Sequence, residues 1–285
     1  MPFLLKWKHY SLDLDKKTHI MGILNVTPDS FFDGGKYFDK EKAIEHGIKM
    51  VEQGADIIDV GGESTRPYSK RISAQEEMDR VIPVIEELAK KVDVPISIDT
   101  YKSEVAKEAI NAGASIINDI SAFRFDPDMV KVAAEAKVPV VLMHMKGRPE
   151  NMQDNPQYKN LMEEIISFLR QAKQYAVNNG IKEELIILDP GIGFGKRLEH
   201  NLEIIKSLAR LSELNSPILI GPSNKAFIAT VVGEDIEDRD TGTMATIACA
   251  IMNGAHIVRV HNVEKAVKTA KMVDAIKRGE HAFVC

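Results

Sequence analysis

The sequence predicts a (β/α)8 barrel of the TIM type, and three observations support that prediction. Eight short apolar runs follow one another along the chain, and a helix-length segment lies between each run and the next. The runs are rich in Ile and Val and show little polar alternation, which is typical of parallel strands buried on both faces. Each run also ends in a polar residue. A barrel of this kind gathers the carboxyl ends of its strands on one face, where its active site is built.

The predicted elements alternate along the chain. Residues 4–14 indicate an N-terminal β-hairpin that closes the amino-terminal mouth of the barrel. The strands are expected at 20–26, 56–60, 95–99, 115–119, 138–143, 185–189, 217–221 and 257–260. Helical periodicity predicts helices at 42–53, 74–91, 103–111, 127–135, 158–178, 201–214, 242–252 and 263–277. Several helices end close to a glycine, which adopts the left-handed cap conformation without steric penalty; these are Gly54, Gly113, Gly180 and Gly254.

Length and composition indicate one globular domain over residues 1–285, with residues 1–19 as the hairpin extension. A chain of 285 residues lies within the range of single α/β barrels. Its formal net charge of -5 argues against a general nucleic-acid partner. No apolar run approaches the roughly 20 residues of a membrane-spanning helix, so we expect no membrane partner. Two cysteines, Cys249 and Cys285, provide no disulfide framework, which favours the cytoplasm.

Polar loops follow the first two predicted strands. Asn25 begins the first loop and offers a carbonyl oxygen, a ligand that Mg²⁺ accepts while it keeps most of its waters. The alternative is an ordinary turn, because the Pro, Asp, Ser and Gly of this loop favour turns. The second loop contains Thr65, Arg66 and Pro67, and Arg66 is suited to binding a phosphate or a carboxylate. Alternatively, Arg66 simply pairs with Glu63 at the surface.

Hydrogen-bond acceptors end the third, fourth and sixth strands. These are Asp99, Asn118 and Asp189, which suit the amino and ring N–H groups of a flat heterocycle. A buried carboxylate is costly unless it is paired, so these positions need an explanation. Each residue could instead cap the helix that follows it. Three such residues together favour a ligand.

The last two strands end in cationic groups. Ser223 and Lys225 follow the seventh strand, and Arg259 and His261 end the eighth, where barrels often bind phosphate. Exposed surface cations are the alternative interpretation. The glycine-rich run 189–196 has the spacing of neither a P-loop nor a Rossmann fingerprint. His144 is expected to be a packed or hydrogen-bonded histidine, and the sequence contains no HExxH, CxxC or GxSxG motif.

Taken together, these motifs resemble the dihydropteroate synthase family from about residue 20 to about residue 276. The matching segments are 25–31, 61–67, 97–100, 117–119, 189–196, 223–225 and 259–261. The resemblance implies a transferase of folate biosynthesis and a sulfonamide target. In that reaction 6-hydroxymethyl-7,8-dihydropterin diphosphate joins 4-aminobenzoate, and diphosphate leaves.

The resemblance also implies residue roles, a Mg²⁺ cofactor and a homodimer. Asp99, Asn118, Asp189 and Lys225 would hold the pterin, with Asp99, Asp189 and Lys225 as the catalytic set. Asn25 would bind Mg²⁺, and Arg259 and His261 would hold the diphosphate with it. Thr65, Arg66, Pro67 and Ser223 would form the aminobenzoate side. The family usually has Arg and Asp where this chain has Asn224 and Asn262, which bears on aminobenzoate affinity.

Two other functions are compatible with several of these residues. A methyltetrahydrofolate-corrinoid methyltransferase would share the pterin acceptors but would not need the cationic group around Arg259 and His261. A catalytically silent pterin-binding protein is the second alternative, and Asn224 is the residue that favours it. Asp59 and His144 have no assigned role beyond supporting nearby loops.

Overall fold

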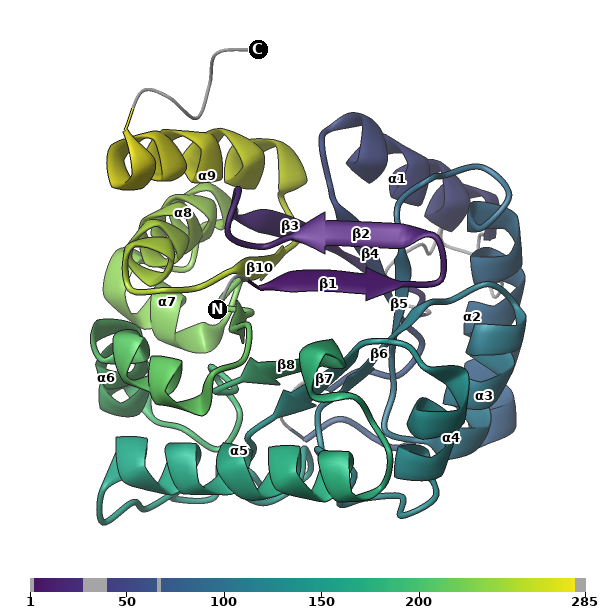
Figure 1. Cartoon of the computed structure of the whole chain (residues 1–285). Helices are drawn as coiled ribbons and strands as arrows, with labels where there is room; N and C mark the ends of the chain where they lie inside the picture. Colours follow the sequence, from purple (N-terminus) through teal and green to yellow (C-terminus); the bar gives the residue numbers. More distant parts are fainter. Residues whose placement is uncertain (1–2, 28–39, 66–67, 280–285) are drawn as a thin grey trace.

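The computed structural model describes residues 3–27, 40–65 and 68–279, and its architecture is an eight-stranded parallel barrel surrounded by helices (Figure 1). The predicted (β/α)8 barrel and N-terminal hairpin are both confirmed. The barrel strands are β3 His19–Asn25, β4 Ile57–Gly61, β5 Ile96–Asp99, β6 Ile116–Asp119, β7 Val140–Met143, β8 Ile186–Asp189, β9 Leu219–Ile220 and β10 Ile257–Val260. The helices are α1 Lys40–Glu52, α2 Ala74–Leu88, α3 Ser103–Asn111, α4 Met129–Ala136, α5 Leu161–Asn178, α6 Leu198–Lys206, α7 Ala226–Val232, α8 Ile236–Met252 and α9 Val263–Arg278.

The barrel closes between β8 and β9. Hydrogen-bonded neighbours follow the order β8-β7-β6-β5-β4-β3-β10-β9, and every pair is parallel. A single bridge between Leu188 and Ile218 joins the two ends, and the Leu188 N–H donates to the carbonyl oxygen of Pro217 at 2.9 Å. The strands are buried on both faces, as their Ile and Val content predicts.

The hairpin covers the amino-terminal mouth. Strands β1 (Leu4–Trp7) and β2 (Tyr10–Asp13) pair antiparallel and lie across the barrel in Figure 1. Lys8 Nζ donates to the carbonyl oxygen of Ala114, just before β6, at 3.4 Å. The Phe3 ring packs edge-on against His256, just before β10, at 5.0 Å. The opposite, carboxyl-terminal mouth is therefore the one left for a site.

Some helix boundaries differ from the predictions, because a side chain caps the helix or because the helix is interrupted. Helix α5 begins at Leu161 rather than at 158, because the Asn160 side chain accepts the Glu163 N–H and caps it. The segment predicted as one helix at 201–214 is divided into α6 and a 3-10 helix, Leu208–Leu214. The short helix α7 was not predicted, since its seven residues are too few for a clear period.

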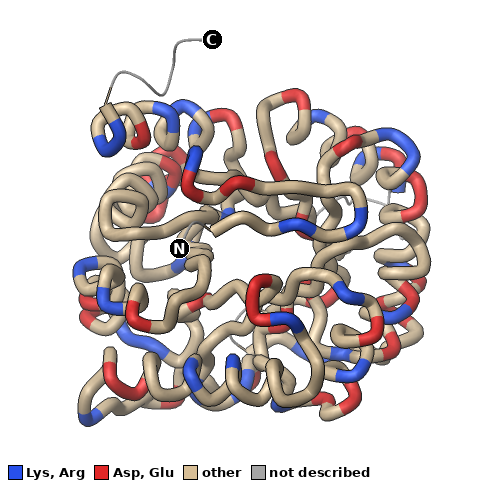
Figure 2. The backbone as a smooth tube through the Cα atoms, in the orientation of Figure 1, with Lys and Arg blue, Asp and Glu red and all other residues tan. Residues whose placement is uncertain are grey.

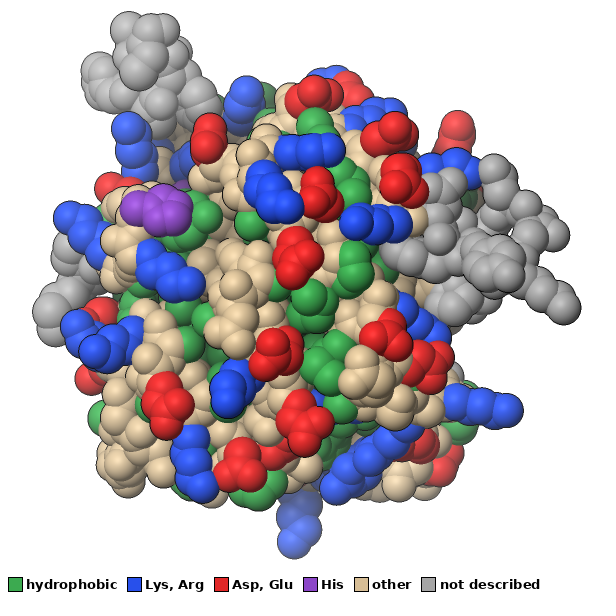
Figure 3. Space-filling model, turned by 90° about the vertical axis from the view of Figure 1, so that its right-hand side faces the viewer, with side chains coloured by type: hydrophobic (Ala, Val, Ile, Leu, Met, Phe, Trp, Pro, Cys, Tyr) green, Lys and Arg blue, Asp and Glu red, His purple; other side chains and the backbone are tan. Residues whose placement is uncertain are grey.

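Charged side chains of both signs are distributed over the outer helices. Figure 2 shows Lys and Arg interspersed with Asp and Glu around the barrel. Figure 3 shows the same mixture on the side of the molecule that includes α2 and α3. Within the described ranges, no helix combines the length and the apolar character that crossing a bilayer requires.

Candidate active site

A buried ionic network lies at the carboxyl-terminal mouth of the barrel. Arg259 on β10 donates from Nε to Asp59 Oδ2 and from a terminal nitrogen to Asp99 Oδ2, both at 2.6 Å. Asn118 on β6 donates from Nδ2 to the same Asp59 oxygen at 3.0 Å. The Asp59 side chain is completely buried, and the Arg259 side chain is 18% exposed. One arginine thus connects strands β4, β5 and β10.

Strand register explains why these residues meet. Asn25 pairs with Gly61, Gly61 with Asp99, and Asp99 with Asn118, so the four form one row across β3 to β6. Asp59 lies two residues before Gly61 on the same strand, so its side chain points to the same side one layer deeper. Arg259 pairs with Met21 below that layer and extends its long side chain upward to the carboxylates.

The network perturbs the protonation of its members. Burial raises the pKa of Asp99 to about 7; Arg259 opposes this rise, and the carboxylates of Asp59 and Glu77 add to it. Burial would lower the pKa of Arg259, but Asp59 and Asp99 raise it above its ordinary value. Arg259 is therefore permanently charged, and Asp99 changes its charge near neutral pH. Such a carboxylate is a candidate for a functional group.

Helix capping does not explain Asp99 or Asn118. The residue before α3 is Lys102, and the Ser103 N–H is accepted by Asp126 at 2.7 Å. Asn118 uses its amide on Asp59. Asp119, in contrast, has a structural role, because its two oxygens accept the N–H groups of Ser121 and Phe123 at 2.7 Å.

That Asp119 turn stores backbone strain. Ala122 and Phe123 have φ angles of 51° and 68°, in the left-handed region that costs a residue with a Cβ about 1–3 kcal/mol. The two Asp119 hydrogen bonds stabilise the turn, which begins just after Ile120. The strained turn thus fixes how the chain leaves β6 at the mouth.

Asp189 begins the glycine-rich loop after β8. Its Oδ1 accepts the Gly191 N–H at 2.6 Å, and its carbonyl oxygen accepts the His144 N–H at 2.9 Å. Burial raises the pKa of Asp189 to about 6, while the Gly191 N–H and the charge of Lys196 oppose the rise. A Cβ on Gly191 would lie 1.9 Å from the carbonyl oxygen of His144, and the residue has a φ of +73°. Only glycine fits there, so the loop lies directly against the end of β7.

An apolar wall faces the acceptors, and sequence reasoning did not identify it. A buried cluster at this mouth contains Tyr101, Ile120, Met143, Met145, Met152 and Phe194. Lys225 Nζ lies 4.1 Å from the centroid of the Phe194 ring, within cation–π range. Ile120 follows the end of β6, two residues after Asn118. The position of Met143 emerges only from its register with Asp189. Acceptors beside apolar side chains suit a flat ligand that carries N–H groups.

Ser223 and His261 form a hydrogen-bonded pair after β9 and β10. Ser223 Oγ lies 2.9 Å from His261 Nδ1, and the His261 N–H donates to the same oxygen at 3.2 Å. Asn224 Nδ2 lies 3.5 Å from Nδ1, and Asn224 Oδ1 is buried without a hydrogen-bond partner within the described ranges. The other departure, Asn262, caps α9 by accepting the Lys265 N–H and donates to Asp240 at 2.7 Å.

Ionic contacts and a hydrogen bond hold the loop after β4 in place. Glu63 accepts from Tyr101 at 2.7 Å and pairs with Lys102, which also contacts Glu77 at 2.5 Å. Half-buried Thr65 follows on this loop. Arg66 and Pro67 lie outside the described residues, so their predicted roles stay predictions. Within the described ranges, Glu63 contacts Lys102 and Tyr101 and also accepts the Ile72 N–H at 3.3 Å.

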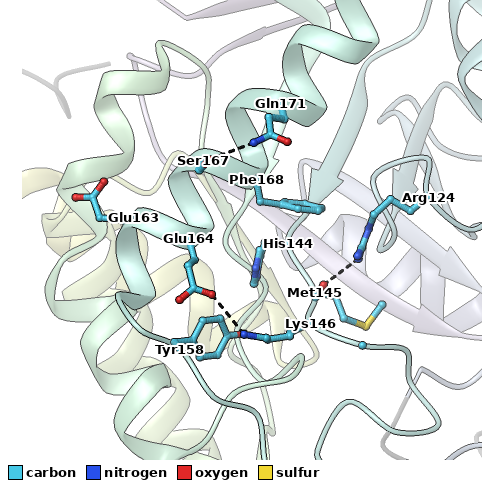
Figure 4. A pocket seen from close by; sticks show the side chains of 11 residues that line it. Arg124, His144, Met145, Lys146, Tyr158, Glu163, Glu164, Ser167, Phe168 and Gln171 are labelled. Atoms are coloured by element: carbon cyan, nitrogen blue, oxygen red, sulfur yellow. Dashed lines mark hydrogen bonds and ion pairs between the residues drawn. The ribbon is translucent and has the colours of Figure 1, made fainter.

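His144 is packed and hydrogen bonded, as the sequence predicts. Figure 4 shows its ring between Phe168 and Tyr158, at the inner end of a pocket of about 510 Å³ under α5. The ring packs edge-on against Phe168 at 5.0 Å, and Nδ1 lies 3.0 Å from Lys196 Nζ. Burial and the charge of Lys196 hold the pKa of His144 well below its ordinary value, so the ring is neutral.

The described side chains at the carboxyl-terminal mouth could hold a hard cation only weakly. Asn25, half-buried at the end of β3, offers one neutral amide oxygen. Within the described ranges, no three His, Cys, Asp or Glu side chains are arranged to hold a metal ion. Mg²⁺ commonly uses one or two protein ligands and takes the others from phosphate and water. The mouth therefore suits Mg²⁺ that arrives with a phosphorylated ligand.

Comparisons with known proteins agree with this geometry. Residues 21–261 match a family model described as pterin binding enzyme. Dihydropteroate synthase of Clostridium beijerinckii is 50% identical over 267 residues, covering 93% of this chain and 97% of that protein. A crystal structure of Yersinia pestis dihydropteroate synthase with a sulfonamide drug complex superposes with a TM-score of 0.92 at 42% identity, over 97% of this chain and 100% of that one. Xanthomonas albilineans dihydropteroate synthase in complex with 7,8-dihydropteroate has a TM-score of 0.86 at 39% identity, over 95% and 98%.

Replacing Asp59 with alanine is expected to destabilise the barrel. Asp59→Ala leaves the Asn118 amide unpaired and removes one of two carboxylates from Arg259. Breaking a buried pair in this way costs about 3 kcal/mol of unfolding free energy. Urea denaturation followed by circular dichroism measures the change. The control is Glu87→Ala, which removes an exposed pair with Lys90 and should leave the free energy of unfolding nearly unchanged. Equal losses in the two variants would contradict a central role for Asp59.

Proposed function

The chain belongs to the dihydropteroate synthase family, and we propose that the residues at its carboxyl-terminal mouth carry out that family's reaction. The reaction joins 6-hydroxymethyl-7,8-dihydropterin diphosphate to 4-aminobenzoate, gives 7,8-dihydropteroate and releases diphosphate. One observation carries this assignment of residues. Three strand-end acceptors, Asp99, Asn118 and Asp189, lie beside an apolar wall and within one cationic site.

The pterin lies between the acceptors and the apolar wall. A pterin ring is flat and presents several N–H donors along one edge, which matches the ionised carboxylates of Asp99 and Asp189. Met143 and Phe194 provide apolar surface for its faces. Lys225 donates to a ring oxygen or nitrogen while its ammonium stays against Phe194. Sharing the ligand among three strands fixes its orientation.

The diphosphate lies toward β3 and β10. Arg259 keeps donors beyond the two that it gives to Asp59 and Asp99, since a guanidinium has five N–H groups. His261 adds a ring that Ser223 orients. Asn25 would hold Mg²⁺, which supplies charge neutralisation for the leaving diphosphate when it is bound. Arg259 therefore serves both sides of the site, because one guanidinium contacts the pterin acceptor Asp99 and faces the diphosphate.

The aminobenzoate enters from the outer side, near Ser223 and the loop with Thr65, Arg66 and Pro67. The C–O bond to diphosphate breaks, and the leaving group keeps the electron pair. The electron-rich dihydropterin stabilises the resulting methylene cation. The aromatic amine then forms the C–N bond and loses a proton. The barrel contributes fixed acceptors around the ring, cations at the leaving group and exclusion of water.

We also propose that the protein is a cytoplasmic homodimer. Of the ten exposed large apolar side chains in the part of the chain that the structure describes, seven lie on α6 to α9: Leu202, Val231, Val232, Ile236, Met252, Met272 and Ile276. These helices lie on the left in Figure 1, away from the charged face of Figure 3. Exposed apolar side chains gathered in this way support a protein interface. The exposed free thiol of Cys249 on α8 supports a reducing compartment.

A diphosphate-release assay tests the function. Diphosphate should appear only when the pterin diphosphate, 4-aminobenzoate and Mg²⁺ are all present. Pterin binding by calorimetry without diphosphate release would instead favour a silent pterin-binding protein. Methyl transfer to a corrinoid protein would favour the methyltransferase alternative.

Replacing Lys225 with alanine should weaken pterin binding. A hydrogen bond to a charged group contributes about 1.5–3 kcal/mol, so the dissociation constant for pterin diphosphate should rise about 10- to 100-fold. Isothermal titration calorimetry measures it, with exposed Lys271→Ala on α9 as the control. Wild-type affinity in Lys225→Ala would remove Lys225 from the pterin site.

Pterin binding should weaken as the solution is acidified. Asp99 has a pKa of about 7 and Asp189 of about 6, and each accepts a pterin N–H more strongly when it is ionised. Affinity is therefore highest above pH 7 and falls in two steps toward pH 5. The ligand for this titration is 6-hydroxymethyl-7,8-dihydropterin, which has no diphosphate to titrate. Asp99→Asn should remove the upper step only; a flat wild-type profile would refute the assignment.

Charged substitutions on α7 and α8 should separate the dimer. Val231→Glu combined with Ile236→Glu places two carboxylates on the exposed apolar surface, where burial in an interface is costly. Sedimentation velocity should show a dimer for the wild type and a monomer for the variant. Leu4→Glu, an exposed apolar position on the hairpin, is the matched control and should stay dimeric. A monomeric wild type would contradict the dimer.

A further inference from the structure

Lys196 is a buried cation that the proposed reaction does not use. It ends the loop after β8, and only 3% of its surface is exposed. A buried ammonium is costly unless it is well hydrogen bonded. Burial lowers the pKa of Lys196 to about 7, and the Asp189 carboxylate counteracts that change. The side chain is therefore protonated over the acidic range in which Asp189 titrates.

Three acceptors surround the ammonium. Lys196 Nζ lies 3.0 Å from the Phe194 carbonyl oxygen, 3.0 Å from His144 Nδ1 and 3.4 Å from the His144 carbonyl oxygen. These equal the three protons that an ammonium can donate. Two acceptors belong to the end of β7 and one to the loop after β8. The ammonium therefore joins the two segments.

The joined segments carry two members of the pterin site. The Lys196 bond to the Phe194 carbonyl holds the residue whose ring lies against Lys225. The Asp189 backbone accepts from His144, and its carboxylate accepts from Gly191, which lies directly against the His144 carbonyl. Any movement of the loop away from β7 would therefore rotate Asp189 and displace Phe194.

Further contacts hold the same loop from outside. Tyr158 donates from its hydroxyl to the Gly195 carbonyl at 2.7 Å, and Gln153 donates to the Gly193 carbonyl at 2.7 Å. Asn201 accepts the Gly193 N–H at 2.8 Å. Figure 4 shows Tyr158 beside His144 on the side of the pocket under α5. These contacts are neutral, whereas Lys196 also brings a charge.

We propose that Lys196 is a positioning residue for pterin binding: tied to His144, it fixes the loop that carries Phe194 and supplies a cation that keeps Asp189 ionised. This inference rests on the proposed pterin site.

Besides Lys196 on its own loop, the cations that face Asp189 are Lys225 after β9 and Arg259 on β10. Two other titratable groups lie at strand ends on this mouth: neutral His144, just after β7, and Asp99 at the end of β5. Among these cations, Lys196 favours the ionised form of Asp189 most strongly, so its removal has a specific consequence.

The test compares Lys196→Met with Tyr158→Phe by calorimetry, using 6-hydroxymethyl-7,8-dihydropterin between pH 5 and pH 8. Lys196→Met should raise the dissociation constant at pH 6.5 about tenfold, because Lys196 is mostly protonated there and its loss removes the tie between the loop and β7. It should also move the lower, Asp189 step of the pH profile upward by about one pH unit, because the nearby cation is gone. Tyr158→Phe loosens the loop without changing charge, so it should weaken binding less and leave that step in place.

Exposed Lys206→Met on α6 is the matched control and should bind like the wild type. Wild-type affinity and an unmoved Asp189 step in folded Lys196→Met would overturn the proposal, as would weaker binding with the step unmoved. If Lys196→Met does not fold, Tyr158→Phe decides, and wild-type binding by that variant would overturn the proposal. A wild type that fails to bind the pterin at all would instead refute the proposed function.

Discussion

The guanidinium of Arg259 holds together the carboxyl-terminal mouth of the barrel. It lies in a largely buried position and contacts two carboxylates that come from different strands. A buried carboxylate without a partner would be strongly unfavourable, and so would a buried guanidinium. Each group is stable only because the others are present. The arrangement brings β4, β5 and β10 into one electrostatic unit at the carboxyl-terminal mouth of the barrel.

The same network tunes the groups that it holds. Asp59 is completely buried and faces Arg259 and Asn118, so it has a structural role that the sequence left unassigned. Asp99 shares the arginine but lies beside other carboxylates, and its pKa rises to about 7. Under the proposed function, Arg259 serves both halves of the reaction: it fixes the pterin acceptor Asp99 and faces the leaving diphosphate.

A second constraint is the close approach of the loop after β8 to the end of β7. Gly191 permits contact with the His144 carbonyl, and Lys196 hydrogen bonds both segments. On the neighbouring strand, Asp119 stabilises a strained turn just after Ile120. Apolar residues at the mouth are thus positioned by polar groups behind them. Rigid placement of this kind suits a reaction in which the protein mainly orients and excludes water.

The sequence by itself determined the barrel, because Ile and Val runs of strand length repeat between helical segments, and it indicated the chemistry, because polar residues end those runs. Motif similarity then assigned the roles of Asp99, Asn118, Asp189 and Lys225. The tertiary structure alone decided which of these residues touch. The row from Asn25 to Asn118 depends on strand register, and the contact between Arg259 and Asp59 joins residues 200 positions apart. Local patterns specify periodicity and side-chain type, whereas register and long-range pairing depend on how the whole barrel closes and packs.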